Sequence, residues 1–125
     1  MFRAAHEALA SQRTTLDLPD IRNSLRSVMW RNVGIVRDAA RLTETCDILR
    51  FWGHYTLDKT FDEPDGWELQ NMLTIAYVIA QSALQRGESL GVHFRSDAPS
   101  GEQSPAGKIY HTIVSRDGVS RMRHE

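Results

Sequence analysis

The stretch DGWELQNMLTIAYVIAQSALQRG, from Asp65 to Gly87, decides the fold. Its apolar residues recur at spacings of three and four, which is typical of a helix with one buried face. They are Leu69, Met72, Leu73, Ala76, Ile79, Ala80 and Ala83. Further apolar residues lie on other sides, so we expect this helix to be central or covered on two sides. Asp65 and Glu68 predict a capping box at its start, and Gly87 predicts its C-terminal cap.

Two more helices precede this one. Asp17 is a candidate N-cap for the first helix, and Gly34 predicts its end through a left-handed glycine. Asp38 is a candidate N-cap for the second helix, which we expect to fray before Lys59. Three helices with short connections predict an all-α fold, a three-helix bundle of the spectrin-repeat type, over residues 18–99.

The two ends of the chain are predicted to lie outside this bundle. Residues 1–17 predict a short amphipathic N-terminal helix and a linker. Residues 100–125 predict a flexible, irregular tail, in which KIYHTIV (108–114) alternates weakly and favours one short strand. Because a single strand is not stable alone, it would either pair with another domain or stay loose.

Composition excludes several classes of protein. The 125 residues carry a formal net charge of −1, with no basic excess for nucleic-acid binding. No run of about 18 apolar residues predicts a membrane span, and the N-terminus lacks the apolar region of a signal peptide. The one cysteine, Cys46, lies on the apolar stripe of the second helix, which predicts a buried, inert thiol. We expect a cytoplasmic protein.

The sequence shows no pattern for catalysis or metal binding. None of its five histidines stands four residues from another, as a helical metal site would require. No glycine-rich phosphate loop and no serine elbow occurs. We therefore predict no catalytic, cofactor-binding or metal-binding residue in this chain.

One polar segment, GVHFRSDAP at 91–99, departs from the pattern of a bundle. Alternation in an extended chain places three of its polar side chains on one side: His93, Arg95 and Asp97. Such a group is suited to holding another surface or a carboxylate through charge-assisted hydrogen bonds. The alternative is a solvated loop that packs Val92 and Phe94 against the bundle.

A second polar cluster surrounds Gly34 and consists of Trp30, Asn32, Arg37 and Asp38. The simpler interpretation of this cluster is a turn between two helices with a surface salt bridge, worth at most about 1 kcal/mol.

Two blocks of the sequence resemble a known family. They run from Leu25 to Asp38, with MWRNVGIVR in the middle, and from Glu68 to Pro99, with ELQNML and ESLGVHFRSDAP at its ends. Together they resemble the C-terminal domain shared by L-aspartate oxidase and the flavoprotein subunits of succinate dehydrogenase and fumarate reductase. Leu90 stands where the family motif usually has arginine, and Ala98 where an aromatic residue is common. The resemblance therefore implies that one docking contact of the family differs in this chain.

The resemblance implies a three-helix bundle that packs on a flavin-binding domain. Full-length L-aspartate oxidases use FAD to oxidise L-aspartate to iminoaspartate in de novo NAD biosynthesis, and their catalytic and flavin-contacting residues lie upstream. The resemblance thus implies no cofactor in this chain and structural or interdomain roles for the matching residues. These are Trp30, Gly34, Arg37, Glu88, Gly91, His93, Arg95 and Asp97.

Other assignments stay open at this point. The 26 residues after Pro99, with Ile109 to Thr112, resemble the short tail of an aspartate oxidase more than the longer tails of the dehydrogenases. A free-standing helical interaction module derived from the same family is the second class. A small metal or nucleotide binder is the third. An isolated domain would expose its docking face, so we also expect self-association into a homo-oligomer.

Overall fold

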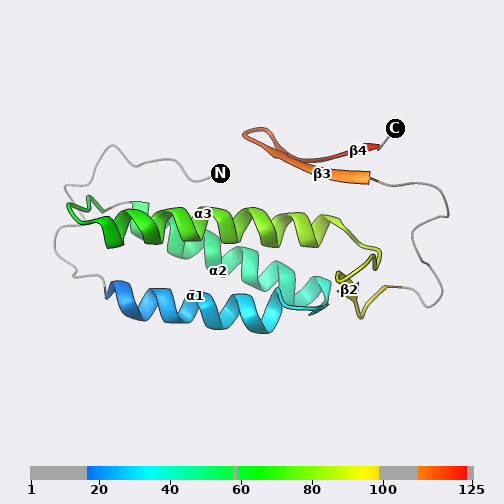
Figure 1. Ribbon diagram of the computed structural model, residues 1–125, viewed down its shortest axis with the longest axis horizontal. Helices are drawn as coiled ribbons and strands as arrows, with labels where there is room; N and C mark the ends of the chain where they lie inside the picture. Colours follow the sequence, from blue (N-terminus) through cyan, green and yellow to red (C-terminus); the bar gives the residue numbers. More distant parts are fainter. Residues whose placement is uncertain (1–16, 58, 99–109, 124–125) are drawn as a thin grey trace.

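The computed structural model describes residues 17–57, 59–98 and 110–123. Three helices form the predicted bundle: α1 (Leu18–Asn32), α2 (Ala39–Leu57) and α3 (Pro64–Gln85). Figure 1 shows α3 along the whole length of the bundle, with α1 below it and α2 crossing behind it. The predicted all-α bundle is confirmed, whereas the predicted N-terminal helix lies outside the described residues.

The core lies mainly between α2 and α3, which make the most extensive contact of any two helices. Four leucines at this contact are almost inaccessible to solvent: Leu42, Leu49, Leu69 and Leu73. From α1, Leu25 and Val28 are also buried. Cys46 is buried as predicted, and this burial raises the pKa of its thiol. The predicted apolar stripes therefore do form the core.

The first two helices begin at the predicted caps. Asp17 Oδ1 accepts a hydrogen bond from the backbone N–H of Asp20 at 3.1 Å. Asp38 Oδ1 accepts one from the backbone N–H of Arg41 at 2.9 Å. Each bond satisfies a donor that the first turn of a helix leaves unpaired.

The predicted ends of α3 are wrong. Its N-cap is Glu63, whose side chain makes no capping bond, so Asp65 and Glu68 form no capping box. Pro64 begins the helix instead, because its fixed φ angle suits the first helical position. At the other end the C-cap is Arg86, and Gly87 has no positive φ.

Gly34 is also not the left-handed cap that we predicted. Among the described glycines only Gly91 (φ 59°) and Gly118 (φ 129°) have a positive φ angle. A Cβ atom on Gly34 would lie 2.7 Å from the carbonyl oxygen of Trp30. The turn therefore uses glycine because the chain passes close to the last turn of α1.

Two short strands join segments that are far apart in the sequence. β1 (Val36–Arg37) pairs in parallel with β2 (Phe94–Arg95), in the register Val36 to Phe94 and Arg37 to Arg95. This pairing holds the segment after α3 against the turn between α1 and α2 (Figure 1).

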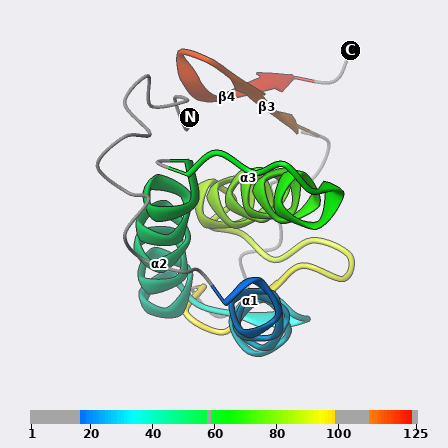
Figure 2. The ribbon, with the colours of Figure 1, turned by 90° about the vertical axis from the view of Figure 1, so that its left-hand side faces the viewer.

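A β-hairpin replaces the predicted lone strand and tail. β3 (Tyr110–Ser115) pairs antiparallel with β4 (Gly118–Arg123). The partner of the strand is thus within this chain, and residues 110–123 are not irregular. Figures 1 and 2 show the hairpin over α3, on the side away from α1. None of the helices described here is long and apolar enough to cross a membrane.

Candidate functional site at the bundle end

Most of the polar residues predicted from the sequence meet where α1 and α3 end and α2 begins. We call this cluster the bundle end, and it consists of Arg37, Arg86, Glu88, His93, Arg95 and Asp97. The β1–β2 pairing brings its two halves together, because Arg37 and Arg95 are partners in the register.

Arg95 is the central cation of the bundle end, and its side chain is only 6% exposed. Its Nη1 donates to three carbonyl oxygens at the C-terminus of α3: Ala83 at 3.4 Å, Leu84 at 3.2 Å and Arg86 at 3.0 Å. These carbonyls have no partner within the helix, and they carry the negative end of its dipole. A guanidinium group both donates hydrogen bonds to these carbonyls and places a positive charge at the negative end of the dipole.

Asp97 completes this arrangement from the other side. Its two carboxylate oxygens accept from Nε and Nη2 of Arg95 at 2.8 and 3.0 Å. Oδ2 also accepts from the backbone N–H of Ala39 at the start of α2, at 3.1 Å. The bonds from Arg95 and then from Ala39 hold the pKa of Asp97 well below its usual value.

His93 is buried and held by two bonds. Arg37 Nη1 lies 2.8 Å from Nδ1, and the carbonyl oxygen of Arg86 lies 2.8 Å from Nε2. A guanidinium group can only donate, so Nδ1 accepts and the ring hydrogen is assigned to Nε2. Burial, and then the charges of Arg37, Arg95 and Arg86, lower the pKa of His93. The imidazole is therefore neutral near pH 7.

Arg37 connects the turn after α1 to this imidazole. Its Nε donates to the carbonyl oxygen of Gly34 at 2.7 Å, and its Nη2 donates to that of Val33 at 3.2 Å. Partial burial lowers the pKa of Arg37. The salt bridge expected in this turn forms between Asp38 and Arg41 at 3.5 Å and does not include Arg37. Asn32 donates to Thr45 on α2.

The alternation predicted for residues 91–99 is present from Val92 to Arg95, but the side that faces the bundle is the polar one. His93 and Arg95 point into the protein and are buried, whereas Val92 is 83% exposed and Phe94 50% exposed. The predicted packing of Val92 and Phe94 on the bundle is therefore wrong. Unpaired carbonyls at the end of α3 favour buried donors over buried apolar side chains.

The remaining predicted residues take different places. Glu88 forms an ion pair with Arg86 at 3.2 Å. Gly91 lies in a tight turn closed by two backbone bonds between Leu90 and His93, where its φ of 59° favours glycine. Trp30 makes no part of the bundle end and is 84% exposed.

Two residues of the site were not singled out from the sequence. The carbonyl of Arg86 accepts from both His93 and Arg95. Ser89 Oγ accepts from the backbone N–H of Arg95 at 2.9 Å. A basic residue beside the end of a helix is a known signal for a C-terminus, and this signal was available at Arg86.

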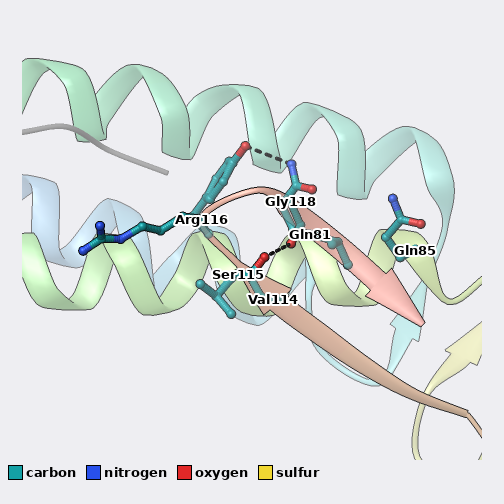
Figure 3. A pocket seen from close by; sticks show the side chains of 9 residues that line it. Gln81, Gln85, Val114, Ser115, Arg116 and Gly118 are labelled. Carbon is teal, nitrogen blue, oxygen red and sulfur yellow. Dashed lines mark hydrogen bonds between the residues drawn. The ribbon is translucent and has the colours of Figure 1, made fainter. Parts of the chain in front are cut away.

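Two open pockets lie between α3 and the hairpin. The smaller one, of about 150 Å³, is lined by Tyr77, Gln81 and Gln85 of α3 and by the hairpin turn. Figure 3 shows Gln81 bonded to the Tyr77 hydroxyl and Arg116 extending away from Gln85. The larger one, of about 380 Å³, lies beside the bundle end and includes Arg37, Arg86, His93 and His111.

The chemistry of the bundle end is that of a structural site, which holds the ends of helices together. Arg95 and Asp97 are bonded to the ends of α3 and α2, and the histidine is held on both ring nitrogens. Within the described parts of the chain, no three His, Cys, Asp or Glu side chains gather as a metal site would require.

Comparisons with known proteins agree on one region of one family. The profile of the family described as "Fumarate reductase flavoprotein C-term" matches residues 22–124. L-aspartate oxidase of Acinetobacter baylyi is 34% identical over 89 residues, covering 65% of this chain and 15% of that protein. An FAD-dependent oxidoreductase of Methanocaldococcus jannaschii is 31% identical over 107 residues, covering 82% of this chain and 20% of that protein.

A solved structure is similar as well. The Mycobacterium smegmatis Sdh1 complex in the apo form has a chain with a TM-score of 0.64 and 25% identity, covering 94% of this chain and 22% of that one. The present chain thus spans about one fifth or less of each protein that it resembles.

Proposed function

Since this chain belongs to the family of fumarate reductase flavoprotein C-terminal domains, we propose that it serves an L-aspartate-oxidase-like enzyme by packing on its flavin domain. The enzyme as a whole would oxidise L-aspartate with FAD, as the first step of NAD biosynthesis, in the cytoplasm. This domain would contribute no catalytic residue and no flavin ligand. The FAD would be held by residues outside this chain.

An exposed apolar surface carries the proposal. It consists of Trp30, Ile35, Val36, Leu90, Val92 and Phe94, and we call it the end patch. Five of its members lie along one short stretch of backbone, because Ile35 adjoins Val36, Val36 pairs with Phe94, and the turn from Leu90 through Val92 precedes the same strand. Ile35 is 70% exposed and Val92 83% exposed. Exposed apolar residues that are contiguous mark surfaces that bind another protein or domain.

The bonds of the bundle end fix the backbone segment that carries part of the end patch. His93 and Arg95 alternate with the exposed Val92 and Phe94 along the same short segment. Because the polar side chains are fixed to α3 and α2, the apolar side chains are held in one arrangement before docking. Such preorganisation reduces the entropy lost on association.

A second assignment has its own support. The Sdh1 structure is similar over 94% of this chain, with a TM-score of 0.64. The chain would then be the C-terminal domain of a succinate dehydrogenase or fumarate reductase flavoprotein. Both assignments use the same docking surface and differ in the flavin domain that receives it.

A domain exchange tests the proposal. In the Acinetobacter baylyi L-aspartate oxidase, the matching C-terminal segment would be replaced by this chain, and a parallel exchange would use the Mycobacterium smegmatis Sdh1 flavoprotein. We expect the oxidase chimera to retain FAD through gel filtration and to oxidise L-aspartate. Retention of flavin only in the Sdh1 chimera would favour the second assignment.

The isolated chain provides the complementary measurement. We expect it to purify without bound flavin and to show no L-aspartate oxidation. If neither chimera retains flavin while chimeras with the C-terminal domains of other oxidases do, the chain is better described as a free-standing interaction module.

A further inference from the structure

Arg37 differs from the other arginines near the bundle end in the partners of its charge. Three neighbouring arginines form ion pairs with carboxylates: Arg41 with Asp38, Arg86 with Glu88, and Arg95 with Asp97. In the described part of the chain, Arg37 has neutral partners only, namely two carbonyl oxygens and the Nδ1 atom of His93. A partly buried cation without an anion is uncommon, because its desolvation is not compensated by a charge.

The guanidinium group of Arg37 also has donors to spare. It carries five N–H groups in one plane. One on Nε, one on Nη1 and one on Nη2 are used in the bonds to Gly34, His93 and Val33. One N–H on each terminal nitrogen remains, and guanidinium N–H groups are the donors that bind carboxylates and phosphates.

Arg37 lines the larger pocket, between the C-terminal half of α3 and strand β3. The polar groups on its other walls are Ser82 from α3, Arg86 from the cap of that helix, His93, and His111 and Thr112 from β3. None of the described residues that line the pocket is an aspartate or glutamate. The described walls of the pocket thus present guanidinium and hydroxyl groups to a ligand, and no negative side chain.

The negative end of α3 does not cancel this positive character. The carbonyl oxygens of Ala83, Leu84 and Arg86 at this helix end accept bonds from Arg95, and that of Arg86 also accepts from His93. Their partial charges are therefore directed at donors within the bundle end. The charge of Arg37 remains for a ligand in the pocket.

We propose that this pocket binds an oxyanion, a carboxylate or a phosphate group, with Arg37 as its principal ligand and Arg86, Ser82 and Thr112 around it. The group would come from a small acid in solution or from an acidic side chain of a docked domain. This proposal does not depend on the identity of the flavin domain, and the chimeras described above do not test it.

The test is a titration of the full 125-residue chain at pH 7, in which the backbone amide signals are monitored by NMR. The probes are acetate, inorganic phosphate and a glutamate blocked at both main-chain ends, each compared with sodium chloride at equal ionic strength. We expect saturable shifts at Ser82, Arg86, His111 and Thr112, with a Kd on the order of 1 to 10 mM. Tighter binding of the blocked glutamate than of acetate would point to a side chain of a partner. Equal or tighter binding of phosphate would point to a small ligand.

Two variants show whether the response comes from the pocket. Arg37→Lys keeps the charge but loses the planar fork, and we expect the Kd to rise about tenfold or more. The matched control is Arg41→Lys, an exposed arginine paired with Asp38, which should leave the Kd unchanged. If Arg37→Lys does not fold, Thr112→Val should still raise the Kd several-fold from the wall of the pocket. Equal shifts with chloride, or an unchanged Kd in the pocket variants, would overturn the proposal.

Discussion

Arg95 and Asp97 form a two-bond ion pair that joins the ends of two helices. The guanidinium group reaches the last carbonyls of α3, and the carboxylate reaches the first free N–H of α2 at Ala39. The positive charge thus lies at the negative end of the α3 dipole, and the negative charge lies at the positive end of the α2 dipole. The pair replaces the glycine cap that the sequence predicted for α3.

Replacing the cation should show how much the bundle depends on this pair. Arg95→Met leaves the α3 carbonyls without their donor and Asp97 without its cation. We expect the free energy of unfolding to fall by about 2–4 kcal/mol, measured by urea denaturation. Arg22→Met is the control, because it removes an ion pair to Glu68 that is largely exposed, and it should cost less than about 1 kcal/mol. Equal losses in the two variants would contradict the assigned role.

The buried imidazole of His93 predicts a dependence of stability on pH. Its pKa is lowered in the folded chain, so the unfolded chain binds a proton first as the pH falls. The stability that the neutral ring provides is therefore fully present above about pH 6.5 and is lost as the pH falls towards the folded pKa. The measurement is the free energy of unfolding between pH 7.5 and about pH 5. Over this range Asp97 does not contribute, because its pKa lies below 3.8.

Two variants assign this pH dependence. His93→Gln should remove most of the slope between pH 7.5 and 5, whereas the exposed His54→Gln should leave it in place. A slope that survives in His93→Gln would show that another group titrates.

The two glycines near the helix ends predict opposite effects of an added methyl group. In Gly34→Ala the new Cβ would meet the Trp30 carbonyl oxygen at 2.7 Å, so the backbone must shift, at a cost of about 1–3 kcal/mol. In Gly87→Ala no atom lies within 4 Å and φ is not positive. That variant should be neutral or slightly more stable. Thermal unfolding of both variants checks the difference, and a larger loss at Gly87 would contradict it.

The end patch predicts where a charge interferes with docking. Val92→Asp places a carboxylate in the middle of the patch without touching the core, because Val92 is 83% exposed. In the oxidase chimera this charge should weaken docking, so that FAD is held at least tenfold less tightly. The measurement is the loss of FAD on dilution. Ile75→Asp is the control, since Ile75 is 59% exposed on α3 and is not part of the patch. Similar losses from both variants would argue against docking at the end patch.

The bundle was predictable because its signals are local and repeated. Helical spacing marked the buried leucines, and side-chain caps at Asp17 and Asp38 marked two helix starts that the structure confirms. The start of α3 was predicted at the wrong residue because two signals compete there. Pro64 determines the first turn, and Gly66 fits under Phe61, where a Cβ atom would overlap the ring.

The bundle end was only partly predictable. Alternation showed that His93 and Arg95 share a side, but the direction of that side depends on carbonyls of α3 and on a strand pairing with residues near position 36. Such contacts are distant in sequence and leave no local pattern. The hairpin did leave one, since Asp117 and Gly118 form a common turn signal between alternating residues.

The β1–β2 pairing also bears on the order of folding. Ala39 and Asp97, which it brings together, are separated by 58 positions in the chain. Closing so long a loop loses much chain entropy, whereas each helix needs only near neighbours. The helices should therefore assemble first, and β1 and β2 should pair last. Mutations in the β1–β2 pairing would then accelerate unfolding more than they slow refolding. The pairing would therefore stabilise the protein mainly by lowering its unfolding rate.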